Sequence, residues 1–422
     1  MTLIVQKYGG SSVATPDRLA AVAARIAAAR RAGSRVAVVV SAMGRTTDEL
    51  LALAGEVGET PSPRELDHLL SAGEQISSAL LTMALHRIGV QACSLSGRQA
   101  GLRTTAAHGG ARILDIDPAR VHRELDQGRI VVVAGFQGVR PDTSDTTTLG
   151  RGGSDTTAVA LAAALGARRC EIYTDVDGVY TADPRLVPDA RRIPALGHPA
   201  MLELATAGAK VLVARCVECA HRHGVRLHVR SSYTDHPGTL VSADPEDIME
   251  QPAITGVAHD RSVAAVTLTG VPSGPATTAL VLRAVAVTGV EVDMLTRTPA
   301  LAGSSTVEVT VVVPEPGLPR VLAALEARRP EIGFTRLAHD ESAGKVSVIG
   351  TGVRSDPTVT ARFLETLAGA GLRQLVVSEL RLSALCDRAR LDEAVRALHR
   401  AFDLHEPPRL VLPASRRAGA QV

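Results

Sequence analysis

The sequence predicts an α/β fold in which a mostly parallel sheet lies between helix layers, followed by two small units of the order β-α-β-β-α-β. Up to about residue 245, apolar runs rich in β-branched residues alternate with amphipathic runs, a pattern typical of a parallel sheet covered by helices. Beyond Pro252 the runs become shorter and their order repeats, which indicates an internal duplication. The chain has 422 residues, 45% of them hydrophobic, and therefore has room for about three domains.

The first helix is the best-marked element of the first part. Thr15 can cap it, Pro16 suits its first position and Gly33 ends it. By the same reasoning, further helices are expected at Pro63–Ile88, Asp155–Leu165 and Gly208–His223. Strands are expected at Leu3–Tyr8, Arg35–Ser41, Ala92–Ser96, Ile130–Gly135, Cys170–Asp175 and Arg226–Arg230.

The duplicated part gives two sets of short elements. In the first repeat, strands are expected at Ala264–Leu268, Glu291–Leu295, Thr306–Val313 and Gly333–Ala338, and helices at Ala279–Thr288 and Leu318–Arg328. In the second, strands are expected at Lys345–Ile349, Gln374–Val377, Leu380–Leu385 and Arg409–Leu412, and helices at Thr360–Ala368 and Leu391–Phe402. The predicted domains therefore span residues 1–245, 255–340 and 341–414, with a flexible tail at 415–422. Paired units of this kind commonly bind small ligands between them, which favours a regulatory role.

A glycine-rich segment, Thr148–Thr157, precedes the apolar run Ala158–Leu165. Its glycines let the backbone approach a ligand closely, and the first N–H groups of the following helix point at negative charge. Arg151 adds a planar fork that matches a carboxylate, and Asp155 adds an acid that can hold an ammonium group or organise metal and phosphate. The simpler alternative is a glycine-rich loop with a Ser/Asp cap. The segment predicts a phosphate or carboxylate site.

Other polar residues follow predicted strands and helices. Lys7 leads into Gly9-Gly10, whose N–H groups can contact phosphoryl oxygens, although a strand-end lysine in solvent is the simpler alternative. Glu74 lies among small residues and could pair with an ammonium group. The acids, glycine and proline of Tyr173–Arg185 suit a nucleotide pocket. No P-loop, dinucleotide fingerprint or protein-kinase catalytic loop occurs, so any nucleotide chemistry uses another scaffold.

Composition argues against several classes of partner and site. A net charge of +2, no Trp, four Tyr and four Phe predict no nucleic-acid partner. The N-terminus lacks a signal pattern and no apolar run reaches about 18 residues, so we expect a cytoplasmic protein with no membrane partner. Five cysteines fit reduced thiols. Cys216-x-x-Cys219 resembles zinc-ligand spacing but has no second ligand pair, so no metal is expected to be held by protein side chains alone.

Taken together, the motifs point to one family. They are Lys7-Tyr-Gly-Gly-Ser-Ser, Ser41-Ala-Met-Gly, Gly73-Glu74, Thr148–Thr157, Tyr173–Arg185, Gly208-Ala-Lys210 and Val229-Arg-Ser-Ser232. Over nearly its whole length the chain resembles aspartate kinases of the actinobacterial, single-function type. The resemblance implies an amino-acid-kinase fold followed by two ferredoxin-like ACT domains. It also implies that ATP, with Mg²⁺, phosphorylates L-aspartate to 4-phospho-L-aspartate, the first step of the aspartate-family amino-acid pathway.

The resemblance further implies a role for each motif residue. Lys7 would stabilise the transferring phosphoryl group, and Asp155 would organise the reaction centre. Arg151 would hold the α-carboxylate of aspartate and Glu74 its α-ammonium group. The amino-acid pocket would be completed by Thr47, Gly152, Gly153 and Ser154. The nucleotide side would comprise Gly9, Gly10, Ser41, Thr174, Asp175, Tyr180, Asp183, Arg185 and Lys210. Because a substrate carboxylate is already ionised, no general base is expected.

The regulatory part departs from the family pattern. Ser273-Gly-Pro-Ala276 stands where the family has Asp-x-Pro-Gly, Arg297-Thr298 stands where it has Gln-Asn, and the segment Leu372–Ser378 looks about two residues short. The expected effector positions are Ser273, Asp293, Arg297 and Thr298. We therefore hypothesise intact catalysis with weakened feedback by lysine and threonine. The alternative is that the ACT pair still binds an effector through backbone groups.

Other functions and assemblies stay open at this point. One alternative is another amino-acid-kinase-fold enzyme, acting on an aspartate analogue, glutamate, acetylglutamate, carbamate or UMP. Another is a non-catalytic regulatory subunit, which Lys7 and Asp155 disfavour. ACT units usually pair across chains because their open edges need covering, so we expect a homodimer, or an α2β2 tetramer if Met249 starts a separate β subunit. ACT topology is interleaved in related enzymes, so the segment after Pro252 is expected to pack with the second unit.

Overall fold

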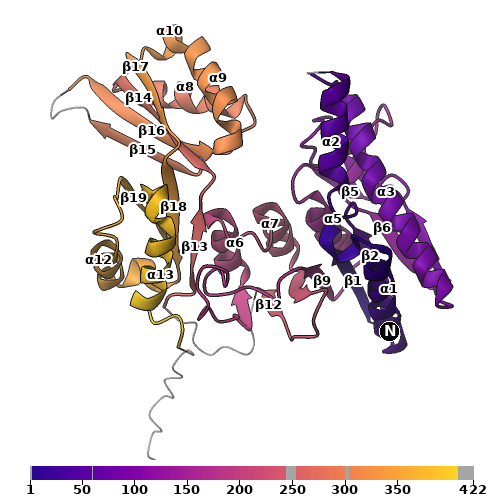
Figure 1. Ribbon diagram of the computed structural model, residues 1–422. Helices are drawn as coiled ribbons and strands as arrows, with labels where there is room; N and C mark the ends of the chain where they lie inside the picture. Colours follow the sequence, from indigo (N-terminus) through magenta and orange to yellow (C-terminus); the bar gives the residue numbers. More distant parts are fainter. Residues whose placement is uncertain (1, 59, 244–252, 300–303, 407–422) are drawn as a thin grey trace, which may run out of the picture. The chain divides into compact units, whose positions relative to one another are not determined.

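The chain divides into two compact units. The computed structural model describes residues 2–58, 60–243, 253–299 and 304–406 (Figure 1). The first unit comprises Met1–Val179, Arg192–Ala205 and Lys210–Asp247, and the second comprises Tyr180–Arg191, Thr206–Ala209 and Ile248–Val422. Two short segments from within the first predicted domain therefore pack with the C-terminal part of the chain. Met249, where a separate subunit could start, lies outside the described residues.

An eight-stranded sheet forms the centre of the first unit. Its strand order is β10-β12-β11-β9-β1-β2-β6-β3, and the pairs are parallel except β11 with β12. The strands are β1 (Leu3–Tyr8), β2 (Arg35–Val40), β3 (Ala92–Leu95), β6 (Ile130–Ala134), β9 (Arg169–Thr174), β10 (Ala195–Gly197), β11 (Arg226–Ser231) and β12 (Thr239–Ser242). The six strands predicted from the sequence are confirmed to within one residue at each end, because buried β-branched runs leave little ambiguity.

Helices cover the two faces of this sheet. Residues Leu19 and Ile26 of α1 (Pro16–Arg31) and Leu81 of α3 (Pro63–Arg87) share one apolar core with Ile4 and Tyr8 of β1. Helix α5 (Gly153–Ala164) contacts β1, β2 and β9. Alternate side chains of a strand point to opposite faces, so Lys7, between Gln6 and Tyr8, points to the α5 side.

Besides β10 and β12 of the central sheet, several elements of the first unit were not predicted individually. They are α2 (Thr46–Val57), α4 (Ala119–Asp126), α6 (His198–Ala207) and a small sheet of order β5-β4-β7-β8, formed by Ile113–Ile116, Leu102–Thr104, Gln137–Val139 and Thr146–Thr148. The helix predicted at Gly208–His223 is wrong at its start, because α7 spans Ala214–His223. Gly208 has φ +116°, and a Cβ there would lie 2.3 Å from the His259 carbonyl oxygen, so this residue forms a turn.

The second unit contains two small antiparallel sheets. The first has the order β15-β16-β14-β17 and carries helices α8 and α9. Its elements are β14 (Val263–Pro272), α8 (Pro275–Ala286), β15 (Met294–Pro299), β16 (Thr306–Pro314), α9 (Leu318–Ala327), α10 (Arg329–Ile332) and β17 (Arg336–Asp340). The other sheet combines β13 (Gly256–Asp260), β18 (Ala343–Ile349), β19 (Gln374–Val377) and β20 (Arg381–Asp387) with helices α11 (Gly352–Ser355), α12 (Pro357–Thr366) and α13 (Leu391–Ala401).

Several predicted boundaries in this unit are wrong. Strand β14 runs on to Pro272, β17 begins only at Arg336, and α12 begins already at Pro357. Helix α8 begins at Pro275, four residues before the predicted Ala279, because proline suits the first helical position. The strand predicted at Glu291–Leu295 begins only at Met294 and runs to Pro299.

The two small sheets are interleaved along the chain, as expected. Strand β13 precedes the first sheet in sequence but pairs antiparallel with β18, giving the order β13-β18-β20-β19. It lies at an edge of the second sheet, and the last strand predicted for the second repeat is not needed to fill that position. That strand, Arg409–Leu412, falls outside the described residues.

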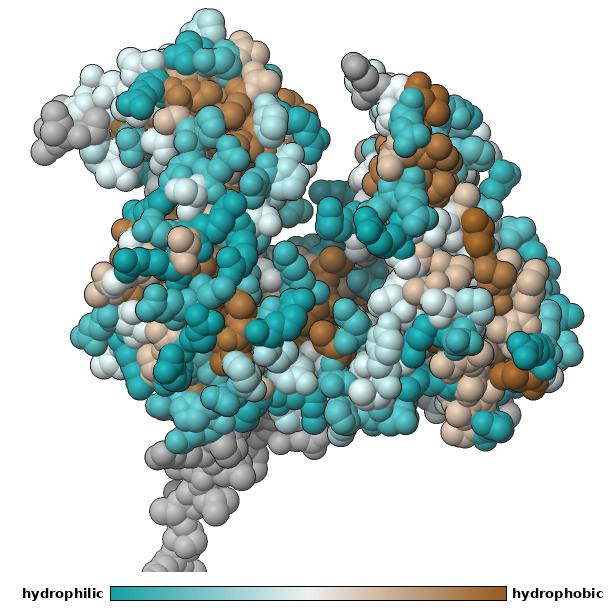
Figure 2. Space-filling model, viewed as in Figure 1, coloured by the Kyte–Doolittle hydropathy of each residue, from teal (hydrophilic) through white to brown (hydrophobic). Residues whose placement is uncertain are grey.

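The outer surface of the first unit carries exposed apolar side chains over α2 and α3 (Figure 2). Ile76, Leu80 and Met83 follow one another along α3 at helical spacing and are all exposed. None of the described helices is both long and apolar enough to cross a membrane.

Candidate functional site

A buried ion pair joins β1 to α5. Lys7 Nζ lies 2.7 Å from Asp155 Oδ1, and both side chains are nearly buried. Lys7 is next to the end of β1, where the register places it beside Val39 of β2 and Ile172 of β9. Because these strands are parallel, their carboxyl ends and the turns that follow meet at one edge of the sheet. The predicted catalytic residues Lys7 and Asp155 are therefore brought together there.

The turns after β1 and β2 approach each other through their backbones. Gly44 N–H donates to the carbonyl oxygen of Gly10 (3.0 Å), and Ser41 N–H donates to that of Tyr8 (3.1 Å). A Cβ on Gly10 would lie 2.8 Å from the Ala42 oxygen, so only glycine fits. Thr47 follows in the first turn of α2 and is half-buried. The predicted residues Gly9, Gly10, Ser41 and Thr47 thus belong to adjacent segments.

Glu74 approaches the same edge from α3. Its side chain is 3% exposed, and Oε1 accepts a hydrogen bond from Ala42 N–H at 3.0 Å. Oε2 is buried without a hydrogen-bond partner among the described residues. Burial raises the pKa of Glu74 to about 7. Such an oxygen suits an ammonium group, because a cation would satisfy it and restore the charge.

The glycine-rich segment opens α5 with a tight turn. Gly150 and Gly152 have φ of +76° and +69°, and Gly153 N–H donates to the Gly150 carbonyl oxygen (3.0 Å). A Cβ on Gly152 would lie 2.3 Å from the Val213 side chain. Arg151, between the two turn glycines, is exposed and makes no ion pair with any described residue. Ser154 is buried in the first turn of α5.

The residues predicted for the nucleotide are distributed over both units. Thr174, at the end of β9, donates to the Asp175 carboxylate (3.0 Å); these residues and Lys210 belong to the first unit. Tyr180, Asp183 and Arg185 belong to the second. Within that segment Arg185 bonds Asp183 through its backbone N–H (2.9 Å) and guanidinium group (2.8 and 3.0 Å), which lowers the pKa of Asp183.

Of the four predicted effector residues, Arg297 and Ser273 contact each other, and Asp293 pairs with a lysine outside this set. The Arg297 guanidinium donates to the carbonyl oxygen of Ser273. The Asp293 carboxylate pairs with Lys345, whose side chain is 1% exposed. Thr298 lies on β15, opposite Glu308 of β16.

Sequence reasoning missed the polar residues that hold these loops. Asp67 of α3 and Arg215 of α7 both bond the segments around Ala111 and Leu149. A usable signal was present for Asp67, because it precedes Glu74 by two helical turns and shares its helix face.

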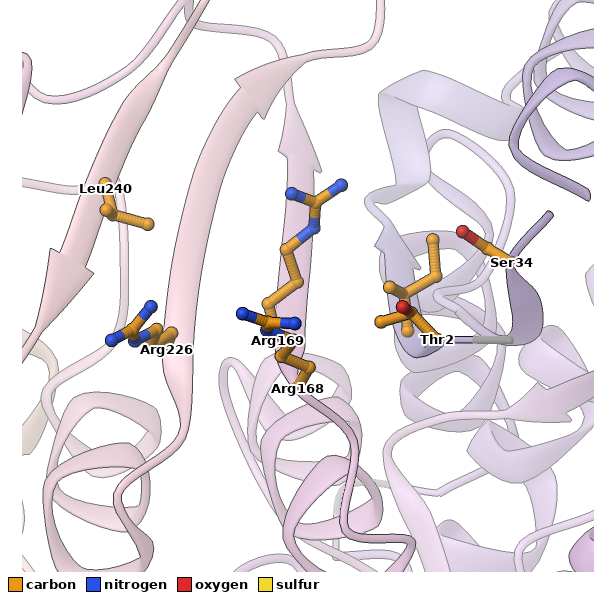
Figure 3. A pocket seen from close by; sticks show the side chains of 7 residues that line it. Thr2, Ser34, Arg168, Arg169, Arg226 and Leu240 are labelled. Atoms are coloured by element: carbon orange, nitrogen blue, oxygen red, sulfur yellow. The ribbon is translucent and has the colours of Figure 1, made fainter. Parts of the chain in front are cut away.

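The described residues form a cavity away from this edge of the sheet. Across the described ranges, no group of three or more His, Cys, Asp or Glu side chains could hold a metal ion. Cys216 and Cys219 lie within α7, and all five cysteines are free thiols. A cavity of about 430 Å³ is lined by Thr2, Ser34, Arg168, Arg169 and Arg226 (Figure 3). It lies at the amino ends of β1, β9 and β11, opposite the Lys7–Asp155 pair.

Comparisons with known proteins agree over nearly the full chain. The amino acid kinase family matches residues 2–231, and an ACT domain matches residues 346–402. The aspartokinase of Mycolicibacterium smegmatis is 54% identical, with 96% of this chain and 97% of that protein covered. The aspartokinase of Corynebacterium glutamicum is 49% identical, with 96% of this chain and 97% of the relative covered. Escherichia coli aspartokinase III, solved with aspartate and ADP, is 28% identical with a TM-score of 0.82, covering 94% of this chain and 99% of that one.

Proposed function

The chain belongs to the aspartokinase family and is an aspartate kinase, and we propose that the edge carrying Lys7 and Asp155 transfers the terminal phosphoryl group of ATP to the side-chain carboxylate of L-aspartate. The observation that carries this proposal is the buried pair at 2.7 Å, with the unpartnered Glu74 Oε2 beside the adjacent strand end. The product would be 4-phospho-L-aspartate, and the reaction would open the aspartate-family amino-acid pathway in the cytoplasm.

Two charged groups suit the two ends of the amino-acid substrate. Glu74 would bind the α-ammonium group through its unpartnered oxygen. Arg151, exposed and free of ion pairs among the described residues, would grip the α-carboxylate. Thr47, Gly152, Gly153 and Ser154 would complete this pocket. The side-chain carboxylate, the nucleophile, is then ionised already, so no residue need act as a base.

The nucleotide would be held by cations and by backbone N–H groups. MgATP, when bound, supplies the phosphoryl group and the divalent charge that offsets its oxygens. Lys7, held in place by Asp155, would stabilise the negative charge of the phosphoryl group during its transfer. Gly9, Gly10 and Ser41 would contact phosphate oxygens, which the Cβ-free approach at Gly10 permits. Thr174, Asp175 and Lys210 of the first unit would bind the rest of the nucleotide.

We also propose that feedback by lysine and threonine is weakened. Arg297 already donates to the Ser273 carbonyl oxygen, and Asp293 is paired with Lys345. Two groups expected to receive an effector are therefore engaged by the chain itself. Assembly as a homodimer, or as an α2β2 tetramer, through the ACT sheets would cover edge strands such as β15 and β19.

The direct test is ATP-dependent trapping of the acyl phosphate with hydroxylamine. We expect hydroxamate from L-aspartate, with little change when lysine and threonine are both added at submillimolar concentration. No product from aspartate, but product from a close analogue, would overturn the substrate proposal. Strong inhibition by the two effectors would overturn the proposal on feedback alone.

A further inference from the structure

The buried carboxylate of Asp67 accepts hydrogen bonds from two separate loops. Asp67 on α3 is 1% exposed. It accepts from Gly109 N–H at Oδ1 (3.0 Å) and Oδ2 (3.1 Å), and from Thr148 N–H at Oδ2 (3.0 Å). The Thr148 hydroxyl donates to Oδ1, and His108 Nδ1 lies 2.8 Å from Oδ2. A carboxylate suits this position because both of its oxygens can only accept hydrogen bonds.

The two loops that Asp67 joins also contact each other. Thr148 is the last residue of β8 and leads directly into Gly150 and Arg151. Ala111 N–H donates to the Thr148 carbonyl oxygen at 2.9 Å. A Cβ on Gly150, where φ is +76°, would lie 3.0 Å from the Gly109 oxygen, so the loops meet backbone to backbone.

A second side chain holds the same two loops from another helix. Arg215 of α7 donates to the carbonyl oxygens of Leu149 (2.8 Å) and Ala111 (2.7 Å). The glycine-rich segment is therefore fixed at Thr148 and Leu149, immediately before Gly150 and Arg151.

We propose that Asp67 is a positioning residue that fixes the Arg151 loop for binding the α-carboxylate of the amino-acid substrate, an assignment that rests on the proposed function. Arg151 lies between two glycines with positive φ and has no ion-pair partner among the described residues. Its guanidinium group must point in one direction to grip a carboxylate with both N–H groups, and a mobile loop would lose that orientation. Asp67 anchors the chain at Thr148, just before the turn that carries Arg151.

The substitution Asp67→Asn tests this assignment with little change in shape. The amide has one oxygen, and its NH₂ group would face N–H donors from Gly109, Thr148 or His108. We expect the KM for L-aspartate to rise about tenfold or more, with kcat changing less and the KM for MgATP staying within about twofold. The matched control is Asp145→Asn. Arg64, which lies on α3 like Asp67, donates to the Asp145 carboxylate (2.9 Å). No hydrogen bond joins the Asp145 side chain to residues 148–154 among the described residues, so the KM for L-aspartate and the KM for MgATP should stay unchanged.

A milder variant covers the case in which Asp67→Asn fails to fold. Thr148→Val removes only the hydroxyl donor, and we expect an increase of about threefold in the aspartate KM, in the same direction. If both folded variants kept the aspartate KM within about twofold of wild type, the assignment would be wrong. An equal rise in the KM for MgATP would also contradict it.

A readout without activity separates this inference from the proposed function. Amide hydrogen exchange should become faster in the peptide covering residues 148–154 of Asp67→Asn, but not of Asp145→Asn. Unchanged protection would overturn the role of Asp67 whatever the substrate. Failure of the wild type to phosphorylate aspartate, with the exchange difference intact, would instead reject the proposed substrate and limit Asp67 to fixing the loop.

Discussion

Lys7 Nζ and Asp155 Oδ1 lie 2.7 Å apart, with 10% and 13% of their side chains exposed. This pair joins the end of the central strand to the first turn of the buried helix α5. In such a water-poor place, a fixed cation acts on developing charge without reorganising solvent.

Replacing Lys7 should therefore abolish most of the activity. We expect Lys7→Met to lower kcat by about 100-fold to 1,000-fold, as for loss of one fixed donor to transition-state charge. Hydroxamate formation at saturating substrates measures the effect. The matched control is Arg35→Met, because Arg35 pairs with Asp126 at the opposite end of the neighbouring strand β2. Activity of Lys7→Met within about tenfold of wild type would remove Lys7 from the reaction centre.

The raised pKa of Glu74 predicts a pH dependence for substrate capture. Its pKa is about 7 in the free protein because burial disfavours the charged form. Binding of an ammonium group needs the ionised carboxylate, so kcat/KM for aspartate should fall as the pH drops below about 7. The profile of kcat, which reports the complex, should shift to lower pH because the bound cation favours ionisation. In Glu74→Gln the step near pH 7 should disappear, while kcat/KM falls at all pH values.

The same pKa predicts an effect on stability in the absence of substrate. Between pH 4.5, the ordinary pKa of a glutamate side chain, and about pH 7, the folded chain keeps a proton on Glu74 that the unfolded chain releases. The contribution of Glu74 to the free energy of unfolding therefore falls as the pH rises through that window and is constant above it. The difference is on the order of 3 kcal/mol. Glu74→Gln should thus be more stable than wild type at pH 8 and similar at pH 4.5, measured by urea unfolding. Equal wild-type and variant stability at pH 8 would contradict the burial of an ionised Glu74.

Features that depend on neighbouring residues in the sequence were predictable, whereas features that depend on contacts between distant segments were not. Strands such as Leu3–Tyr8 were predictable because each is a continuous buried run. That Lys7, Asp155 and Glu74 belong to one site was expected only through motif resemblance, since they come from segments far apart in the chain. The direct ion pair between Lys7 and Asp155 was not predicted. Arg215 was missed because its partners are backbone carbonyl groups, which carry no sequence signal. Asp67 shares a helix face with Glu74, but its partners lie in loops far along the chain, so its role could not be read from the sequence. Strand β13 was not predicted as an element, because only pairing with β18 defines it.

The contact between Arg297 and Ser273 predicts how feedback could be recovered. In the wild type, the guanidinium group donates to the Ser273 carbonyl oxygen and engages the loop before α8. The double substitution Arg297→Gln and Thr298→Asn removes that donor and supplies amide groups that can bind an amino acid. We expect inhibition by lysine plus threonine to appear at lower concentration than in wild type. Arg283→Gln, at an exposed position of α8, is the control and should leave the response unchanged.

Lys345 should be a large contributor to the stability of the second unit. Its side chain is 1% exposed, and its ammonium group donates to the Thr206 carbonyl oxygen (3.1 Å) and pairs with Asp293. Lys345→Met keeps the apolar stem but leaves Arg381, at 3.8 Å, as the one cation near Asp293 in the described part of the chain. Removing one member of a buried pair costs about 3 kcal/mol or more, so the unfolding transition of this unit should move to lower urea concentration. Arg354→Met provides the comparison, because Arg354 and Glu379 are both about three-quarters exposed and an exposed pair contributes at most about 1 kcal/mol. Equal shifts for the two variants would show that burial adds nothing to the Lys345–Asp293 pair.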